Sequence, residues 1–460
     1  MRTCIRWGLL AVLASTLAAC SGGGDSTPTC SYDDPAAAAV SSPWPKFHHD
    51  EQNTGAVANV QLSGTPTCRW VFPPGGADSC LTALTTPPKG AFVASPVINA
   101  DATRIYIGSA DGTLYALNTS DGTQLASTDF SFSTTRPIAS SALVARRAAG
   151  EVVFVGAGDG GLYGLTNVGA AQLTDWPNAI GVSISASPSL VGDGTVCVGS
   201  LNGTFVGVCP NGVARFILST AGSQSSPAQG PDGTLYFGAD DRQLHAVQLN
   251  GNINWSFSAA GPIRAAPVFD AATNSIYVAD QAGRVFKVIA GGRLDAGFAF
   301  GPVGPISSSP ALAEDHLYFG SDDGNLYVID KCTGALAWNF PLPTGGAVVS
   351  SPAVVVEGVL RATTCTVTAP SPPRTVIFGS NSGRVYFVED NGNEGTALGC
   401  FDIATRQPIV CPVDPPLAAD SPNAVRSSPA ISSDGTVYVG ADDGRVYAIG
   451  APLPSPTPSS

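Results

Sequence analysis

The chain has 460 residues, of which only 12 % are charged, and it contains 53 glycines, 37 prolines and one methionine. Its formal net charge is −13 and its lysines and arginines form no cluster. This charge distribution argues against binding to nucleic acid and against electrostatic binding to anionic lipid. The composition is that of an exported protein rich in strands and turns.

Residues 1–19 are predicted to form a signal peptide. Arg2 and Arg6 give a basic start, and an apolar run of about ten residues follows, which is short for a membrane span. The run ends in LAAC, which resembles the bacterial lipobox, so we expect Cys20 to become the lipidated first residue of the mature chain. An ordinary cleavable signal with a chance cysteine is the alternative.

Residues 20–42 are expected to form a flexible tether, because glycine and serine follow Cys20 directly. Serine at position 21 is typical of outer-membrane lipoproteins. We therefore predict a cell-envelope location, with the protein on the outer membrane and facing the periplasm or the cell surface. No later stretch reaches about 18 uninterrupted apolar residues, so no further membrane span is expected.

One pattern then repeats eight times: an alternating apolar run, a short turn with glycine, and a second run that usually carries an aromatic residue. The clearest copy is 427–450, SSPAISSDGTVYVGADDGRVYAIG. Asp-Gly between alternating runs favours a β-hairpin, which cannot bury its apolar face alone. The first strands of the eight hairpins lie at 105–108, 153–156, 196–199, 235–238, 276–279, 317–320, 376–379 and 437–440.

Two further strands complete each repeat. A Ser/Ala-Pro step opens the strand before seven of the hairpins, where the missing N–H of proline costs no ladder bond. A fourth strand carries aromatic residues, most clearly at Trp255 and Trp338. Four strands in roughly 39–46 residues predict an all-β fold, an eight-bladed β-propeller of four-stranded antiparallel blades.

The two ends of the repeat array are predicted to meet. The eighth copy ends at Gly450, before a tail (451–460) that we expect to be disordered, so its fourth strand is missing. Residues 69–72, RWVF, have the W-x-F pattern of the other fourth strands. We therefore expect this N-terminal strand to complete blade eight and close the ring, which removes the open sheet edges.

The propeller is accordingly placed at 67–450, after a lead-in segment at 43–66. The longest step between copies, from Pro352 to Pro429, contains a single hairpin. We interpret this step as one blade, the seventh, with insertions at about 357–374 and 392–425.

The hairpin consensus, V-Y-V-G-x-x-D-G-x-L-Y-A-L, resembles the PQQ-like repeat of quinoprotein-type β-propellers. The run 326–338 carries the longest match to the tryptophan-docking motif of that family, and 44–55 resembles the lead-in found before many such propellers. The family includes quinoprotein dehydrogenases, a lipoprotein of the outer-membrane β-barrel assembly machine and other envelope proteins. The resemblance therefore implies a fold rather than an activity.

Quinoproteins of this family hold the quinone between an aromatic platform and a vicinal disulfide, above a Ca²⁺ ion. No two cysteines are adjacent here, and the shared position of Trp255 and Trp338 in fourth strands favours packing between blades. We therefore predict no cofactor and no enzyme activity. A protein that binds PQQ or another small ligand in the channel is the alternative.

No catalytic, cofactor-binding or metal site is predicted. Aspartates in the hairpin turns could suggest Ca²⁺, but these turns are too short for an EF-hand-type ligand set, and side chains that cap their own turn explain them. The one local cluster of metal-ligand types is 48–51, HHDE, whose lead-in position favours docking against the propeller. His245 and His316 are interpreted as structural, and no G-x-S-x-G, H-E-x-x-H or P-loop motif occurs.

Eleven cysteines occur, and nine remain for disulfides after removal of the signal and acylation of Cys20. Two pairs are close in sequence and lie in loop-rich regions where bridging is easy. These candidate disulfides are Cys68–Cys80 and Cys400–Cys411.

The remaining cysteines leave alternatives open. Cys365 is expected to pair with Cys332 or with a member of the second pair. A Cys197–Cys209 bond is doubtful, because the hairpin register places the two side chains on opposite faces. One thiol stays unassigned, and Cys30 in the tether is a candidate.

The sequence thus predicts a monomeric, lipid-anchored propeller that binds proteins through its loop faces, with the blade-seven insertions as the main partner surface. It predicts no nucleic-acid partner. The alternatives are a component of outer-membrane protein assembly, a PQQ- or small-ligand-binding protein, and a purely structural envelope protein.

Overall fold

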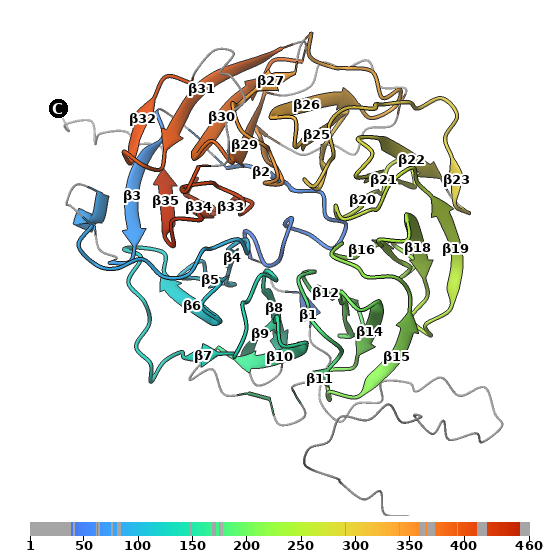
Figure 1. Ribbon diagram of the computed structural model, residues 1–460, viewed down its shortest axis with the longest axis horizontal. Helices are drawn as coiled ribbons and strands as arrows, with labels where there is room; N and C mark the ends of the chain where they lie inside the picture. The colour runs from blue at the N-terminus through green and yellow to red at the C-terminus, as the bar shows by residue number, and fades with distance from the viewer. Residues whose placement is uncertain are drawn as a thin grey trace, which may run out of the picture.

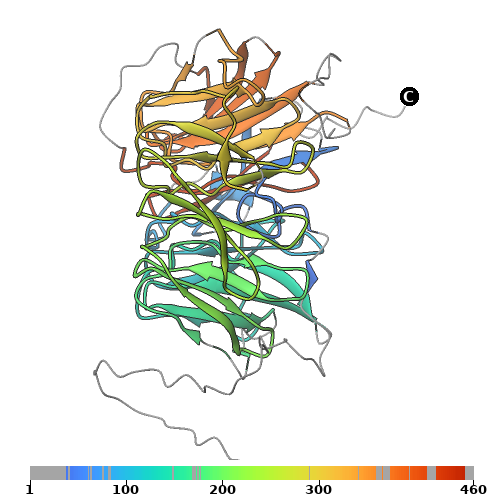
Figure 2. The same cartoon turned by 90° about the vertical axis from the view of Figure 1, so that its right-hand side faces the viewer.

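The computed structural model describes residues 38–39, 42–60, 62, 65–74, 77–80, 84–147, 150–167, 172–173, 176, 178–289, 291–339, 341–358, 365, 373–392, 394–411 and 421–450. These residues form eight β-sheets around a central axis (Figure 1), and their strands are antiparallel except for the pair β2 and β28. Seen from its side, the ring is a thick disc (Figure 2). The predicted all-β, eight-bladed propeller is confirmed. Within these ranges, no helix is long and apolar enough to cross a membrane.

Each blade is a run of strands that begins at the channel and ends at the rim. Blades one and two contain β4 (Val97–Ile98), β5 (Arg104–Gly108), β6 (Thr113–Asn118), β7 (Phe132–Ser133), then β8 (Leu143–Arg147), β9 (Gly150–Gly156), β10 (Gly161–Thr166) and β11 (Asn178–Ala179). Blades three and four contain β12 (Ser189–Leu190), β13 (Val196–Gly199), β14 (Thr204–Val208), β15 (Ala214–Ser219), then β16 (Ala228–Gln229), β17 (Leu235–Gly238), β18 (Gln243–Val247) and β19 (Ile253–Ser258).

The second half of the ring follows the same plan, with additions at blades two and seven. Blades five and six contain β20 (Val268–Asp270), β21 (Ser275–Ala279), β22 (Val285–Ile289), β23 (Arg293–Leu294), then β24 (Ala311–Ala313), β25 (His316–Gly320), β26 (Asn325–Asp330) and β27 (Leu342–Pro343). Blades seven and eight contain β28 (Ala353–Val356), β29 (Arg374–Ser380), β30 (Arg384–Asp390), β31 (Gly395–Asp402), β32 (Gln407–Ile409), then β33 (Ala430–Ile431), β34 (Val437–Gly440) and β35 (Val446–Gly450). The remaining elements are β1 (Ala38–Ala39) on β8, β2 (Ala56–Ala58) on β28, β3 (Thr67–Phe72) on β35, and the 3-10 helix η1 (Ala77–Cys80).

The hairpin turns are held by their own aspartates. In blade one, Asp111 accepts the backbone N–H of Thr113 at 2.9 Å and the hydroxyl of Tyr115 at 2.8 Å. Gly112 has φ of 86°, and a Cβ there would lie 2.6 Å from the carbonyl oxygen of Thr134, so the turn requires glycine. The same Asp–Tyr hydrogen bond recurs in the pairs Asp159–Tyr163, Asp323–Tyr327 and Asp443–Tyr447. The aspartate side chains in these turns therefore cap their own hairpins.

Tryptophans dock between blades, as the sequence pattern indicated. Trp70 of blade eight lies against Gly122 of blade one, where a Cβ would come within 2.3 Å of the indole. The other docked pairs are Trp255 on Gly292 and Trp338 on Gly395. Trp338, however, precedes the fourth strand β27 instead of lying in it, so its predicted strand position is wrong.

The N-terminal strand closes the ring as predicted. Strand β3 pairs antiparallel with β35, from Thr67 opposite Gly450 to Phe72 opposite Val446. Trp70 is 1 % exposed, and its indole N–H donates to the carbonyl oxygen of Thr119 in blade one at 2.8 Å. Closure therefore joins blade eight to blade one through both a strand ladder and a buried aromatic side chain.

Blade seven differs from the sequence analysis. The predicted insertion at 392–425 contains the fourth strand, β31, and an additional rim strand, β32, so this prediction is wrong. The strand went unrecognised because its sequence, GTALGCFD, lacks the W-x-F pattern. On the channel side, β2 adds a parallel strand to β28, which makes this sheet six-stranded.

Three disulfides join described residues: Cys68–Cys80, Cys332–Cys365 and Cys400–Cys411. Of the partners left open for Cys365, the structure thus uses Cys332. Cys197 is buried and free, whereas Cys209 is held in another disulfide, so these two are not bonded to each other. Cys30 lies outside the described residues.

The closing strand yields a stability prediction. Trp70→Ala should lower the free energy of unfolding by about 3–5 kcal/mol, because it leaves a cavity between blades eight and one. Urea unfolding would measure the loss. Ile217, which is 61 % exposed on β15, provides the control, and Ile217→Ala should stay within about 0.5 kcal/mol of wild type. Equal, small losses in both variants would contradict a closing role for β3.

Candidate functional site

The first part of the lead-in segment, up to residue 58, crosses the centre of the ring (Figure 1). Its carbonyl oxygens accept backbone N–H groups from the innermost parts of six blades as it passes around the axis. The donor–acceptor pairs are Ile98 to Trp44, Val144 to Pro45, Gln229 to Glu51, Phe269 to Gln52, Leu312 to Thr54 and Val354 to Gly55, all at 2.7–3.0 Å. The lead-in is therefore an integral part of the ring.

A buried polar core fixes the shape of the lead-in. The ammonium group of Lys46 donates to the side-chain oxygen of Asn53 at 2.7 Å and to the carbonyl oxygen of Asp50 at 2.9 Å. The amide group of Asn53 donates in turn to the carbonyl oxygens of Ser226 and Pro267, in two different blades. Burial lowers the pKa of Lys46, because the charged ammonium group loses its water. The nearby carboxylates of Glu51 and Asp50 act in the opposite direction and offset this effect only in part.

The four side chains of the cluster at 48–51 do not face one common site. His48 is buried and hydrogen-bonded to the carbonyl oxygen of Asn53, and burial lowers its pKa to about 4, so it is neutral at pH 7. His49, Asp50 and Glu51 instead line a cavity of about 510 Å³ beside blades three and four. Among the described residues, no three His, Cys, Asp or Glu side chains form a group that could hold a metal ion.

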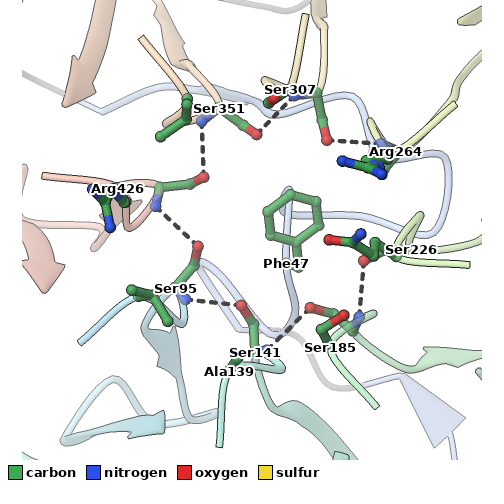
Figure 3. A pocket seen from close by; sticks show the side chains of 17 residues that line it. Phe47, Ser95, Ala139, Ser141, Ser185, Ser226, Arg264, Ser307, Ser351 and Arg426 are labelled. Carbon is green, nitrogen blue, oxygen red and sulfur yellow. Dashed lines mark hydrogen bonds between the residues drawn. The ribbon is translucent and has the colours of Figure 1, made fainter. Parts of the chain in front are cut away.

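A ring of serines lines the channel around the side chain of Phe47 (Figure 3). Each is the residue before the strand-opening proline, or before Ala142 in blade two, and the members of this serine ring are Ser95, Ser141, Ser187, Ser226, Ser309, Ser351 and Ser428. Backbone N–H groups donate to the hydroxyl oxygen of the next blade's serine at 2.8–3.1 Å. Ala266 takes the eighth position and interrupts the ring, because its methyl group cannot accept the amide of Ser226.

The serine ring surrounds a cavity of about 270 Å³. Phe47 of the lead-in projects into the centre of the ring, and Arg264 and Arg426 line the cavity from blades five and eight (Figure 3). Each arginine also pairs with an aspartate, Arg264 with Asp240 at 3.0 Å and Arg426 with Asp442 at 2.9 Å. The cavity is thus lined mainly by hydrogen-bond donors and hydroxyl groups.

This lining does not fit a quinone cofactor above a Ca²⁺ ion. Such a site needs carboxylate oxygens for the metal and a flat aromatic platform for the quinone. The residues that line the cavity include no Asp or Glu, no tryptophan and no cysteine. Trp255 lies in the rim strand β19, and Trp338 is buried against blade seven, so neither is available to the channel.

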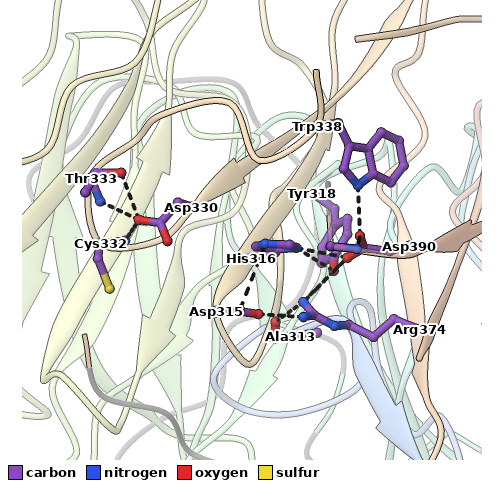
Figure 4. A network of polar contacts seen from close by, with 11 residues as sticks. Ala313, Asp315, His316, Tyr318, Asp330, Cys332, Thr333, Trp338, Arg374 and Asp390 are labelled. Atoms are coloured by element: carbon purple, nitrogen blue, oxygen red, sulfur yellow. Dashed lines mark hydrogen bonds and ion pairs between the residues drawn. The ribbon is translucent and has the colours of Figure 1, made fainter. Parts of the chain in front are cut away.

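A second polar cluster lies buried between blades six and seven (Figure 4). Asp390 Oδ1 accepts the indole N–H of Trp338 at 2.9 Å. The other carboxylate oxygen, Oδ2, accepts the hydroxyl of Tyr318 at 2.5 Å and lies 2.9 Å from Nδ1 of His316. Arg374 donates to the hydroxyl of Tyr318 at 2.8 Å. All five side chains are buried, so the cluster joins blades six and seven, and His316 is one of its members.

Asp390 is charged in this cluster. Burial alone would raise its pKa, but the hydrogen bonds and charges of His316, Tyr318 and Trp338 outweigh burial and hold the pKa well below its usual value. For Tyr318, burial raises the pKa well above its usual value, so its hydroxyl stays a donor. The tryptophan-docking motif is therefore anchored on a buried carboxylate.

The serine ring was not recognised from the sequence. The Ser/Ala-Pro step was visible in seven repeats, but it was explained by its proline alone. The serine before each proline was the signal that could have revealed the ring, because a propeller brings equivalent positions of all repeats to the same height around the axis.

With its eight four-stranded blades and Trp-docking motif, the chain is a β-propeller of PQQ-like repeats. It belongs to the family described as outer membrane protein assembly factor BamB, whose model matches residues 82–215 and 211–451. No curated protein sequence matches the chain.

Two solved structures share the fold. The crystal structure of BamB from Moraxella catarrhalis superposes with a TM-score of 0.54 at 19 % identity, and the match covers 77 % of this chain and 95 % of that one. The computationally designed Ika8 protein matches with a TM-score of 0.51 at 16 % identity, over 85 % of this chain and 98 % of its own. At these identities the likeness concerns the fold alone.

The buried carboxylate gives a pH prediction. Because the pKa of Asp390 is lower in the folded than in the unfolded chain, its stabilising contribution is present above the unfolded value of about 3.9 and is lost as pH falls toward the folded value. Arg374 lies 3.6 Å from Asp390 and 2.6 Å from Asp315, and of these two carboxylates only Asp390 is fully buried. Asp390→Asn should cost about 3 kcal/mol at pH 7, since it removes the buried charge that faces Arg374. The difference in unfolding free energy between wild type and variant should shrink below about pH 4.

Urea unfolding at a series of pH values would measure this difference. Asp129→Asn, at an exposed aspartate in blade one, is the matched control and should leave the profile unchanged. A wild type and an Asp390→Asn variant that lose stability in parallel on acidification would contradict the assignment.

Proposed function

We propose that this chain is a non-catalytic, lipid-anchored envelope protein that binds other proteins during outer-membrane protein assembly. The family match, which extends over residues 82–451, is the observation that carries this proposal. In this view Cys20 anchors the protein to the outer membrane, and the propeller faces the periplasm or the cell surface.

The construction of the ring supports a binding role for its loops. The blade strands pack against one another and the lead-in bonds to their inner edges, so loops and rim strands are the surfaces left for partners. Loops held on a rigid scaffold are the usual place for recognition. Blade seven offers the largest departure from the regular repeat, with the extra strand β32 and two disulfide-held segments.

Blade seven also exposes apolar side chains. Leu398 is 47 % exposed and sits at a bulge in β31, between Ala397 opposite Val388 and Gly399 opposite Phe387. Val410 is 92 % exposed and follows β32, next to the disulfide Cys400–Cys411. A bulge re-aims a side chain, and exposed apolar groups on a fixed segment favour contact with another protein. We therefore place the main partner surface on blade seven.

Two other functions remain as alternatives. The channel lining argues against a PQQ-dependent dehydrogenase, because it lacks carboxylate ligands and an aromatic platform. A purely structural envelope protein would need no specific partner, and the capture experiment separates it from the proposed role.

Affinity capture of the anchored protein from its native membranes tests the partner. We expect the wild type to recover a protein of outer-membrane β-barrel assembly, and Leu398→Asp with Val410→Asp to reduce that recovery by about tenfold, because a charge must lose water to enter an apolar contact. Leu294→Asp is the control, since Leu294 is also 47 % exposed but lies on blade five. Recovery of no assembly protein by the wild type would refute the assembly role, and equal recovery by all variants would refute the blade-seven surface.

Membrane fractionation tests the anchor. Cys20→Ser removes the thiol that would carry the lipid, so the variant should move to the soluble fraction. Ser21→Ala keeps the cysteine and should remain with the membranes. Continued membrane association of Cys20→Ser would rule out anchoring through this residue.

A further inference from the structure

We infer that the cavity inside the serine ring binds a small ligand through an oxyanion, a carboxylate or phosphate group. This inference is independent of the proposed role in outer-membrane assembly. It rests on unused hydrogen-bond donors, on the charge of the lining and on the size of the cavity.

The serine ring presents hydroxyl donors to the channel. The seven serines are 3–6 % exposed, and each hydroxyl oxygen accepts a backbone N–H of a neighbouring blade. Within the described ranges none of these hydroxyls donates to a protein acceptor. A hydroxyl that already accepts one hydrogen bond is polarised toward donating its own proton. The ring therefore offers donors to an acceptor in the cavity, beside the phenyl ring of Phe47.

Ser185 adds a buried hydroxyl without a partner. It lies two residues before Ser187 and lines the same cavity (Figure 3). Its oxygen is shielded from bulk solvent and makes no hydrogen bond to the protein. A buried polar group is normally paired, so this hydroxyl indicates a missing partner inside the cavity.

Arginine supplies positive charge at the same place. Arg264 is 45 % exposed in its side chain and uses its Nε–H for Asp240, which leaves its two NH₂ groups for a ligand. Carboxylate and phosphate groups are the usual partners of this donor pattern. Asp240, Asp442 and Asp322 bond to the lining residues Arg264, Arg426 and Ser307, but none of these carboxylates lines the cavity itself.

The size of the cavity limits the ligand. A volume of about 270 Å³ corresponds to roughly nine water molecules and lies just below the usual range for drug-sized ligands. Phe47 supplies an apolar surface at its centre. A compact anion fits this space, and the donor set would accept either carboxylate or phosphate oxygens.

Isothermal titration calorimetry on the full mature chain in detergent, at neutral pH, tests the inference. The probes are inorganic phosphate and citrate, with glycerol as an uncharged ligand that carries hydroxyl groups. We expect phosphate or citrate to bind and glycerol not to bind, and the tighter anion identifies the oxyanion. Binding of neither anion, or binding of glycerol as tight as that of the anions, would overturn the inference.

Variants place the binding in this cavity. Ser185→Ala and Arg264→Gln should each weaken the anion by about tenfold or more, the loss of one hydrogen bond to a charged group. Arg293→Gln is the matched control, because Arg293 is exposed at the rim of the same blade five. Ser185→Ala removes an unpaired hydroxyl, so its melting temperature should equal that of wild type. Unchanged anion affinity in both variants would assign the binding to another surface.

Discussion

Closure of the ring is the constraint on which the rest of the structure depends. Strand β3 arrives from the N-terminal side and completes blade eight, and at the channel the amide of Ser428 donates to the hydroxyl of Ser95 in blade one at 2.9 Å. A linear array of eight sheets would expose apolar faces at both ends. Closure covers those faces, sets the radius of the channel and gives the lead-in a fixed set of backbone donors.

The parts of this fold that repeat locally could be predicted from the sequence. Alternating runs around a turn glycine define each hairpin, and the W-x-F pattern around Trp70 was sufficient to identify the closing strand. Strand β31 was missed because it carries no such pattern, and the docking tryptophan Trp338 was placed inside a strand that begins only at Leu342. In both cases the rim strand is held by hydrogen bonding to its neighbour, which leaves little trace in its own sequence.

The candidate sites were less predictable because they depend on neighbours that are distant in sequence. The hydroxyl of Ser141 meets the amide of Ser95, one whole repeat away. Asp390 likewise combines with Tyr318 and Trp338 from the preceding blade, and its lowered pKa exists only in that setting. The strands and the lead-in form the core of the ring. Blade seven instead exposes the apolar side chains of Leu398 and Val410, and the serine ring lines the cavity with hydroxyl groups.

Native-state hydrogen exchange is the most direct test of the closed ring. If β3 truly closes it, the amides of β3 and β35 should exchange only through the same global opening as those of the inner hairpin of blade four, β17 and β18, with the same denaturant dependence. Exchange of β3 and β35 through a separate opening of much lower free energy, while blade four stays protected, would contradict the account.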